Sequence, residues 1–224
     1  MFVRHSGFRL ATRRTVYYNA CMKSDLPYQD TREHLLAVAE ELICGRGFAA
    51  CGLAEILQKA QVPKGSFYHY FASKEAFGVA LLQRYFDRYV DELQGQLLAA
   101  DATLGRQRLI AYFSAWVERM RERACMQGCF AVKLSAEVAD LSEPMRATLV
   151  QGMARIEAVL AQALAQLQPP LAGQDARACA ADLYTHWCGA DLQAKVRRSP
   201  EPLEAALRWT ERRLLLELMP VMES

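Results

Sequence analysis

The sequence lacks any long uninterrupted run of apolar residues, although 52% of its 224 residues are hydrophobic. A membrane-spanning helix needs roughly 18 or more consecutive apolar residues. The most apolar stretch, 158–167, is interrupted by Gln162 and Gln166. We therefore expect a protein that does not enter a membrane.

The sequence also lacks a C-x-x-C pair. Its seven cysteines are an odd number and are scattered rather than densely spaced, which favours a reducing, cytoplasmic setting over a disulfide-stapled secreted protein. Cys125 and Cys129 lie four residues apart, and His186 lies two before Cys188, which is thin support for a metal site. We expect no metal and no cofactor.

Common catalytic motifs are missing too. There is no G-x-S-x-G elbow, no P-loop, no G-x-G-x-x-G after a strand and no H-E-x-x-H. An enzyme, for example a thiol-dependent peroxidase or transferase, is the rival class, and the sequence offers it little support. We expect the protein not to be an enzyme.

The net charge of +2 is small, but the charge is unevenly distributed. Residues 1–75 hold ten Lys/Arg and seven Asp/Glu, whereas the remainder holds 17 and 18. DNA-binding proteins often use a local basic patch rather than a high overall charge, so this asymmetry is weak support for DNA binding.

The first 20 residues contain four arginines and no acid, and have no apolar core long enough for a secretion signal. They fit an organelle-targeting segment, an arm that touches DNA phosphates, or an upstream extension from a misassigned start. We favour the last, with translation from Met22, and treat residues 1–29 as a basic extension, disordered or not native.

From residue 30 onward, apolar residues recur at intervals of three and four, which is typical of helices. Asp30 with Glu33 forms a capping box, and Ser73 and Ser142 are expected N-caps. The pattern predicts an all-α protein with helices at about 31–47, 53–60, 64–71, 73–100, 105–124, 129–139, 142–167, 174–197 and 201–218.

The most informative stretch is LAEILQKAQVPKGSFYHYF, residues 53–71, in which a tight turn separates two short helices. In the second helix, Phe67, Tyr70 and Phe71 are expected to face inward. The opposite, polar face suits the major groove and backbone phosphates of DNA. The DNA-contacting residues are then Lys64, Gly65, Ser66, Tyr68 and His69, with Lys74 holding a second phosphate.

The segment VPKGSFYHYFASKEAF, residues 62–77, resembles the DNA-binding head of the TetR family. The resemblance implies a three-helix, helix-turn-helix DNA-binding domain at 30–75. It also implies a helical effector-binding and dimerisation domain at 76–224. An aromatic-rich core helix with no role in DNA binding is the alternative, and it would leave Lys64 and His69 unexplained.

Two further segments, 128–146 (GCFAVKLSAEVADLSEPMR) and 190–202 (ADLQAKVRRSPEP), resemble the branch of the family that represses N-ethylmaleimide reductase. This branch responds to electrophiles and oxidants through cysteine chemistry, which implies Cys129 as the sensor, with Lys195 nearby. The branch has a second cysteine where this chain has Ala139. Cys125 is a conceivable substitute, a question left open because Gly128 could end a helix between Cys125 and Cys129.

A sensor thiol must be reachable and must favour thiolate. Cys129 is expected at a helix N-terminus, where the helix dipole lowers a thiol pKa; the alternative is a small core residue. An apolar effector pocket between helices would be lined by aromatic residues, although plain core packing is the more common role of such residues. The candidates for such a pocket are Tyr112, Trp116, Tyr184 and Trp187.

One short recognition helix buries little surface, so we expect a homodimer on a palindromic DNA operator. Family likeness implies that the helices at 174–197 and 201–218 form the dimer interface, with contributions from Leu183, Trp187, Leu207, Leu214 and Leu218. The predicted function is transcriptional repression, relieved when a small-molecule electrophile or oxidant modifies Cys129. Non-covalent binding of an apolar ligand is the alternative mode of induction.

Overall fold

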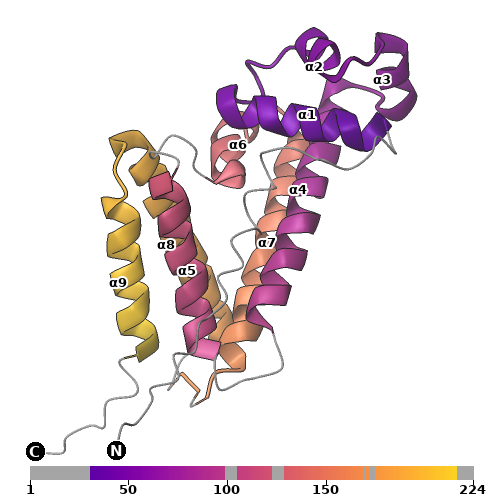
Figure 1. The fold of residues 1–224 in the computed structure, drawn as a ribbon. Helices are drawn as coiled ribbons and strands as arrows, with labels where there is room; N and C mark the ends of the chain where they lie inside the picture. Colours follow the sequence, from indigo (N-terminus) through magenta and orange to yellow (C-terminus); the bar gives the residue numbers. More distant parts are fainter. Residues whose placement is uncertain (1–30, 99–104, 123–128, 169, 172–174, 216–224) are drawn as a thin grey trace, which may run out of the picture.

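The computed structural model describes residues 31–98, 105–122, 129–168, 170–171 and 175–215 (Figure 1). Over these residues the regular structure is helical throughout, which confirms the all-α prediction. The helices are α1 (Thr31–Arg46), α2 (Leu53–Ala60), α3 (Lys64–Tyr70), α4 (Lys74–Leu97), α5 (Gly105–Glu122), α6 (Phe130–Val138), α7 (Glu143–Ala165), α8 (Ala176–Arg197) and α9 (Glu201–Leu215). The basic extension 1–29, Asp30, Cys125 and Leu218 lie outside the described residues.

The predicted serine caps begin the two long helices that pack on each other. Ser73 Oγ accepts the Ala76 N–H at 3.0 Å at the start of α4, and Ser142 Oγ accepts the Met145 N–H at 3.3 Å at the start of α7. Each bond satisfies one of the amides that the first turn of a helix leaves without a partner. Local sequence therefore sets where these two helices start.

Helices α1, α2 and α3 form a small unit, here called the head, at one end of the molecule (Figure 1). The fully buried ring of Phe67 lies 5.2 Å from that of Phe71 and 5.4 Å from that of Phe77, so α3 packs onto the start of α4. The prediction that Tyr70 also faces inward was wrong, since its exposed fraction is 39%. Helix α3 ends at Tyr70, and an extended Phe71 turns back into the core in its place.

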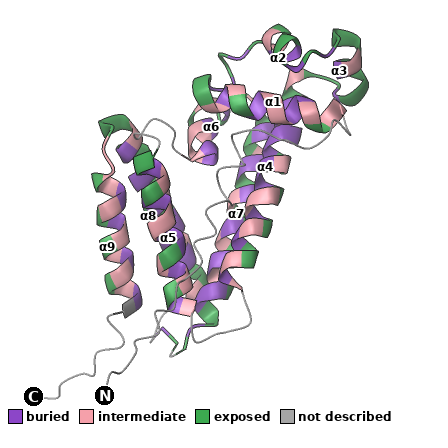
Figure 2. Ribbon diagram, in the orientation of Figure 1, coloured by how far each residue is buried: buried purple, intermediate pink, exposed green. Residues whose placement is uncertain are grey.

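Below the head, α4 and α7 lie side by side, while α5, α8 and α9 form a second group (Figure 1). Gly152 of α7 faces the ring of Phe86 so closely that a Cβ there would lie 2.2 Å from a ring atom. In the second group, the ring of Phe113 stacks on that of Trp187 at 4.5 Å. Figure 2 shows buried residues running along the facing sides of both groups.

Three residues predicted to contribute to a dimer interface are instead completely buried within the single chain. Leu183, Trp187 and Leu214 are each 0% exposed. The Trp187 indole N–H also donates to Thr210 Oγ1 at 3.0 Å, which joins α8 to α9. Of the predicted set, Leu207 is half-buried. The apolar pattern alone could not separate packing between α8 and α9 from packing against a second chain.

The helices of the described residues are all too short or too polar to cross a membrane.

Candidate functional site

The outer face of α3 presents four of the predicted DNA-contacting residues to solvent: Lys64, Gly65, Tyr68 and His69, while Ser66 is half-buried. The preceding turn is sharp because Gln61 adopts a left-handed conformation with φ of 55° and Pro63 is extended. The Lys64 ammonium lies 5.9 Å from the centre of the Tyr68 ring. The exposed face thus combines a cation, hydrogen-bonding groups and a helix start, which suits a phosphate-lined groove.

Lys74 lies at the start of α4 and is half-buried. Its ammonium donates to the Phe48 carbonyl at 3.3 Å and lies 4.9 Å from the centre of the Phe48 ring. The structure therefore gives Lys74 a hydrogen bond to the head. The phosphate contact that the sequence predicts for Lys74 stays a prediction.

The N-cap of α6 is Cys129, which is half-buried. Its backbone N–H donates to Asp191 Oδ2 at 2.9 Å, and its Sγ lies 3.6 Å from the Tyr85 hydroxyl. Helix α6 therefore begins where a side chain of α4 contacts the Cys129 thiol and a side chain of α8 binds the Cys129 backbone.

Asp191 lies on α8 and is only 1% exposed. Besides the Cys129 N–H, its carboxylate accepts the Trp116 indole N–H at 2.9 Å through Oδ1. One buried carboxylate thus joins α5, α6 and α8. Burial raises the pKa of Asp191, and the bonds from Trp116 and Cys129 act in the opposite direction.

The position of Cys129 at a helix start is as predicted, but the expected lowering of its thiol pKa was wrong. Burial raises the pKa of the Cys129 thiol, and the negative charge of Asp191 raises it further. The N–H groups of Val132 and Ala131 and the Tyr85 hydroxyl lower this pKa by smaller amounts. The N–H groups at the helix start do favour thiolate, yet burial, together with the charge of Asp191, outweighs them.

Lys195, a predicted sensing residue, lies near this site, and so does Cys188, for which the sequence predicted no sensing role. Cys188 is half-buried one turn before Asp191 on α8; burial and the charge of Cys129 raise its thiol pKa to about 12. Lys195 is half-buried one turn after Asp191, and its charge acts to lower the pKa of Asp191. Burial lowers the pKa of Lys133, and the charge of Lys195 lowers it further. The structure thus brings Lys195 into the same electrostatic environment as the Cys129 thiol.

The four aromatic residues predicted to line an effector pocket, Tyr112, Trp116, Tyr184 and Trp187, are all at least 94% buried. The Trp116 ring lies 5.5 Å from that of Trp187 and 6.4 Å from that of Tyr112, and the Tyr112 hydroxyl bonds to that of Tyr89. These contacts are core contacts between helices. A ligand-lining role for these residues stays a prediction.

The other part of α6 bonds to the head. Lys133 Nζ donates to the Cys44 carbonyl at 2.7 Å, near the end of α1. Glu137 Oε2 accepts the N–H groups of Phe48 at 2.7 Å and Ala49 at 3.2 Å, in the loop between α1 and α2. One nine-residue helix therefore carries the thiol at its start and holds the head from its last two turns.

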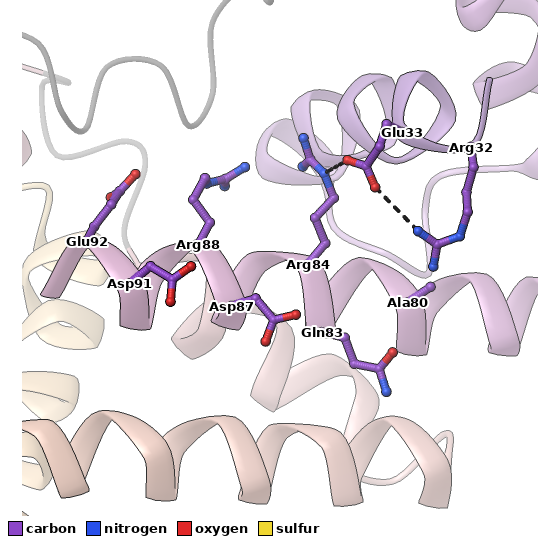
Figure 3. A pocket seen from close by; sticks show the side chains of 9 residues that line it. All are labelled: Arg32, Glu33, Ala80, Gln83, Arg84, Asp87, Arg88, Asp91 and Glu92. Carbon is purple, nitrogen blue, oxygen red and sulfur yellow. Dashed lines mark hydrogen bonds and ion pairs between the residues drawn. The ribbon is translucent and has the colours of Figure 1, made fainter. Parts of the chain in front are cut away.

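A second link joins the head to α4 through Glu40, whose side chain is 4% exposed. Arg84 and Arg88 both pair with this carboxylate, and Arg84 also donates to Glu33 at 2.7 Å. Figure 3 shows Arg84 and Arg88 in a charged groove of about 510 Å³ that runs along α4 beside the start of α1. The ion pairs fix α1 onto the same helix that carries Tyr85.

Sequence reasoning missed Glu40, Glu137 and Asp191, the acids that connect these elements. A signal for Asp191 was present, because it lies on the same helical stripe as Trp187 and Ala194, both of which are buried. An acid on an apolar stripe calls for a buried partner. The partners themselves lie far away in the sequence and could not be named from it.

An N-terminal helix-turn-helix head joined to a helical body defines the class of protein. The profile of "Bacterial regulatory proteins, tetR family" matches residues 35–81, and that of "Tetracyclin repressor-like, C-terminal domain" matches residues 105–210. The chain belongs to the TetR family of bacterial regulatory proteins.

The relatives are transcription regulators rather than enzymes. The chain is 47% identical over 182 residues to the HTH-type transcriptional repressor NemR of Escherichia coli, covering 80% of this chain and 90% of that protein. It is 34% identical to the transcriptional regulator AcuR of Cereibacter sphaeroides, covering 79% and 81%. The crystal structure of the reduced form of E. coli NemR superposes with a TM-score of 0.76 at 45% identity, covering 82% and 96%.

Proposed function

We propose that the protein is a transcriptional repressor whose dimer binds a palindromic DNA operator through α3 and leaves it when an electrophile or oxidant modifies Cys129. In this proposal residues 30–75 bind DNA, and residues 76–224 sense the effector and dimerise. Support comes from the exposed polar face of α3 and from the similarity to a transcriptional repressor over most of the chain.

The observation that carries the proposal is the double attachment of α6. Its N-cap is Cys129, and Lys133 and Glu137 further along bond to the head. A group added to the half-buried Cys129 Sγ must displace Tyr85 or move the start of α6, because close-packed interiors leave little room. Movement of α6 shifts the head relative to α4 and changes the spacing of the two recognition helices of a dimer.

For the dimer interface we propose the outer face of α8, in continuity with α9. Leu192 and Val196 lie one turn apart on this face and are 50% and 75% exposed. Gly189, one turn earlier, has open space where a Cβ would lie. A second copy of the chain covering this stripe would bury the apolar side chains that a lone protomer leaves in water.

Induction by a non-covalent apolar ligand is the alternative mode. It predicts that operator binding returns after dialysis without a reductant, and that Cys129→Ser responds like the wild type. An adduct on Cys129 predicts neither result.

A gel shift on DNA from the promoter upstream of its own gene tests the proposal. N-ethylmaleimide should release the wild-type protein from DNA, while Cys129→Ser should bind DNA and keep binding it after treatment. Cys179→Ser is a matched control, because Cys179 is buried on α8 and should leave the response unchanged. Release of Cys129→Ser by the reagent would overturn the assignment.

A further inference from the structure

The inference rests on the function proposed above and starts from a buried acid that binds the backbone of the cysteine. Asp191 is almost completely buried and accepts two N–H groups, one of them from Cys129 itself. If the carboxylate only capped α6, the capped residue could be any residue, including one that never carries a charge. Here the residue that it caps is the one whose reactivity requires a negative charge.

We propose that Asp191 is a positioning residue that sets the reactivity threshold of Cys129: its carboxylate fixes the Cys129 backbone at the start of α6 and opposes formation of the thiolate. The two negative charges of a thiolate and a carboxylate compete for the same buried space, where their repulsion is stronger than in water. The protein would thus ignore weak or dilute electrophiles and respond only to strong ones.

Other charged and titratable groups act on the same site from each neighbouring helix. These groups are Tyr85 on α4, Tyr112 and Arg119 on α5, Glu157 on α7, and Tyr184, Cys188 and Lys195 on α8. Lys195 and Arg119 favour the charged form of Asp191, since both act to lower its pKa. They therefore oppose the effect of burial, which raises the pKa of Asp191.

The reaction that reports on this threshold is alkylation. The thiol first loses its proton to solvent, the thiolate sulfur adds to the maleimide double bond to form an S–C bond, and the neighbouring carbon takes a proton from water. No group leaves and no oxidant is consumed. The rate below the thiol pKa therefore follows the thiolate fraction.

The test measures the rate of N-ethylmaleimide addition at Cys129 from pH 6 to pH 10 by peptide mass spectrometry, with no DNA present. Asp191→Asn should lower the apparent thiol pKa by about one unit, which raises the thiolate fraction at pH 7 about tenfold. A less basic thiolate is also a weaker nucleophile, so the net gain in rate is about threefold. An unchanged pH profile in a folded Asp191→Asn protein would overturn the proposal.

The matched control is Asp182→Asn. Asp182 is an exposed acid on the same helix as Asp191, and it pairs with Arg213 at 3.8 Å. It should leave the profile of Cys129 unchanged. If Asp191→Asn does not fold, Asp191→Ser replaces it, since a hydroxyl can accept the Cys129 N–H without a charge. If Asp191 had a merely structural role, Asp191→Asn and Asp191→Ser would slow the alkylation of Cys129 or leave its rate unchanged. Neither variant would then shift the pH profile.

The outcome is separate from that of the proposed function. A shifted profile with no release of alkylated protein from DNA would sustain the role of Asp191 and overturn Cys129 as the induction site. Release from DNA on alkylation, with an unshifted pH profile in Asp191→Asn, would support Cys129 as the induction site and overturn the role of Asp191.

Discussion

Glu137 of α6 occupies the space that a side chain at Gly47 would need. A Cβ on Gly47 would lie 2.1 Å from Glu137 Oε1, and Gly47 has a φ of 93°, a backbone conformation that favours glycine. The missing side chain lets the Glu137 carboxylate reach the amides of Phe48 and Ala49. The attachment of α6 to the head thus depends on a glycine directly after α1.

Replacing this glycine should weaken the head. Gly47→Ala places a side chain in a left-handed conformation, which costs about 1–2 kcal/mol from the backbone alone, and it also displaces Glu137. We expect a lower urea midpoint and weaker operator binding. Gly45→Ala is the control: Gly45 lies within α1 with open space around it, so alanine should stabilise by up to about 1 kcal/mol. Equal effects at both positions would contradict the account.

Removal of the Glu137 carboxylate should uncouple the sensor from the head. In Glu137→Ala the amides of Phe48 and Ala49 lose their acceptor, while the surroundings of Cys129 Sγ remain. We expect alkylation of Cys129 at the wild-type rate, measured by mass spectrometry, and a smaller loss of DNA affinity on alkylation, measured by fluorescence anisotropy. Glu143→Ala is the control, because it removes an exposed acid that pairs with Arg146 on α7, and it should keep the full response.

The salt dependence of DNA binding should report the contact of Lys64 with phosphate. Each phosphate neutralised contributes about 0.9 to the slope of log affinity against log salt concentration, so Lys64→Ala should reduce the slope by about two for a dimer. Lys59→Ala is the comparison, because Lys59 on α2 is also exposed but pairs with Glu41 at 3.0 Å. A slope that changes equally in both variants would exclude a specific phosphate contact for Lys64.

The buried carboxylate of Glu40 should contribute more to the free energy of unfolding than the exposed carboxylate of Glu41. Glu40→Gln leaves Arg84 and Arg88 without their shared anion, and breaking a buried pair costs about 3–5 kcal/mol. The loss of unfolding free energy is measured by urea denaturation. Glu41→Gln should change it by less than about 1 kcal/mol, because the Glu41 side chain is 53% exposed. A similar small change in both would show that the Glu40 cluster contributes little.

The sequence was sufficient where the determinants are local. Ser73 and Ser142 cap the helices they were expected to cap, and the exposed face of α3 follows from the spacing of its aromatic residues, Tyr70 excepted. The thiol environment was not predictable, since Asp191 reaches Cys129 from 62 positions away. The same holds for Glu137, whose partners in the head lie 88 and 89 positions earlier.

Coupling between Cys129 and the head is measured most directly at the two amides that Glu137 binds. Hydrogen–deuterium exchange at Phe48 and Ala49 is measured before and after alkylation, in the wild type and in Cys129→Ser. We expect faster exchange at both amides in the alkylated wild type only, because displacement of α6 withdraws their acceptor. Unchanged protection of these amides in protein that has nevertheless left its DNA would contradict a signal carried through α6.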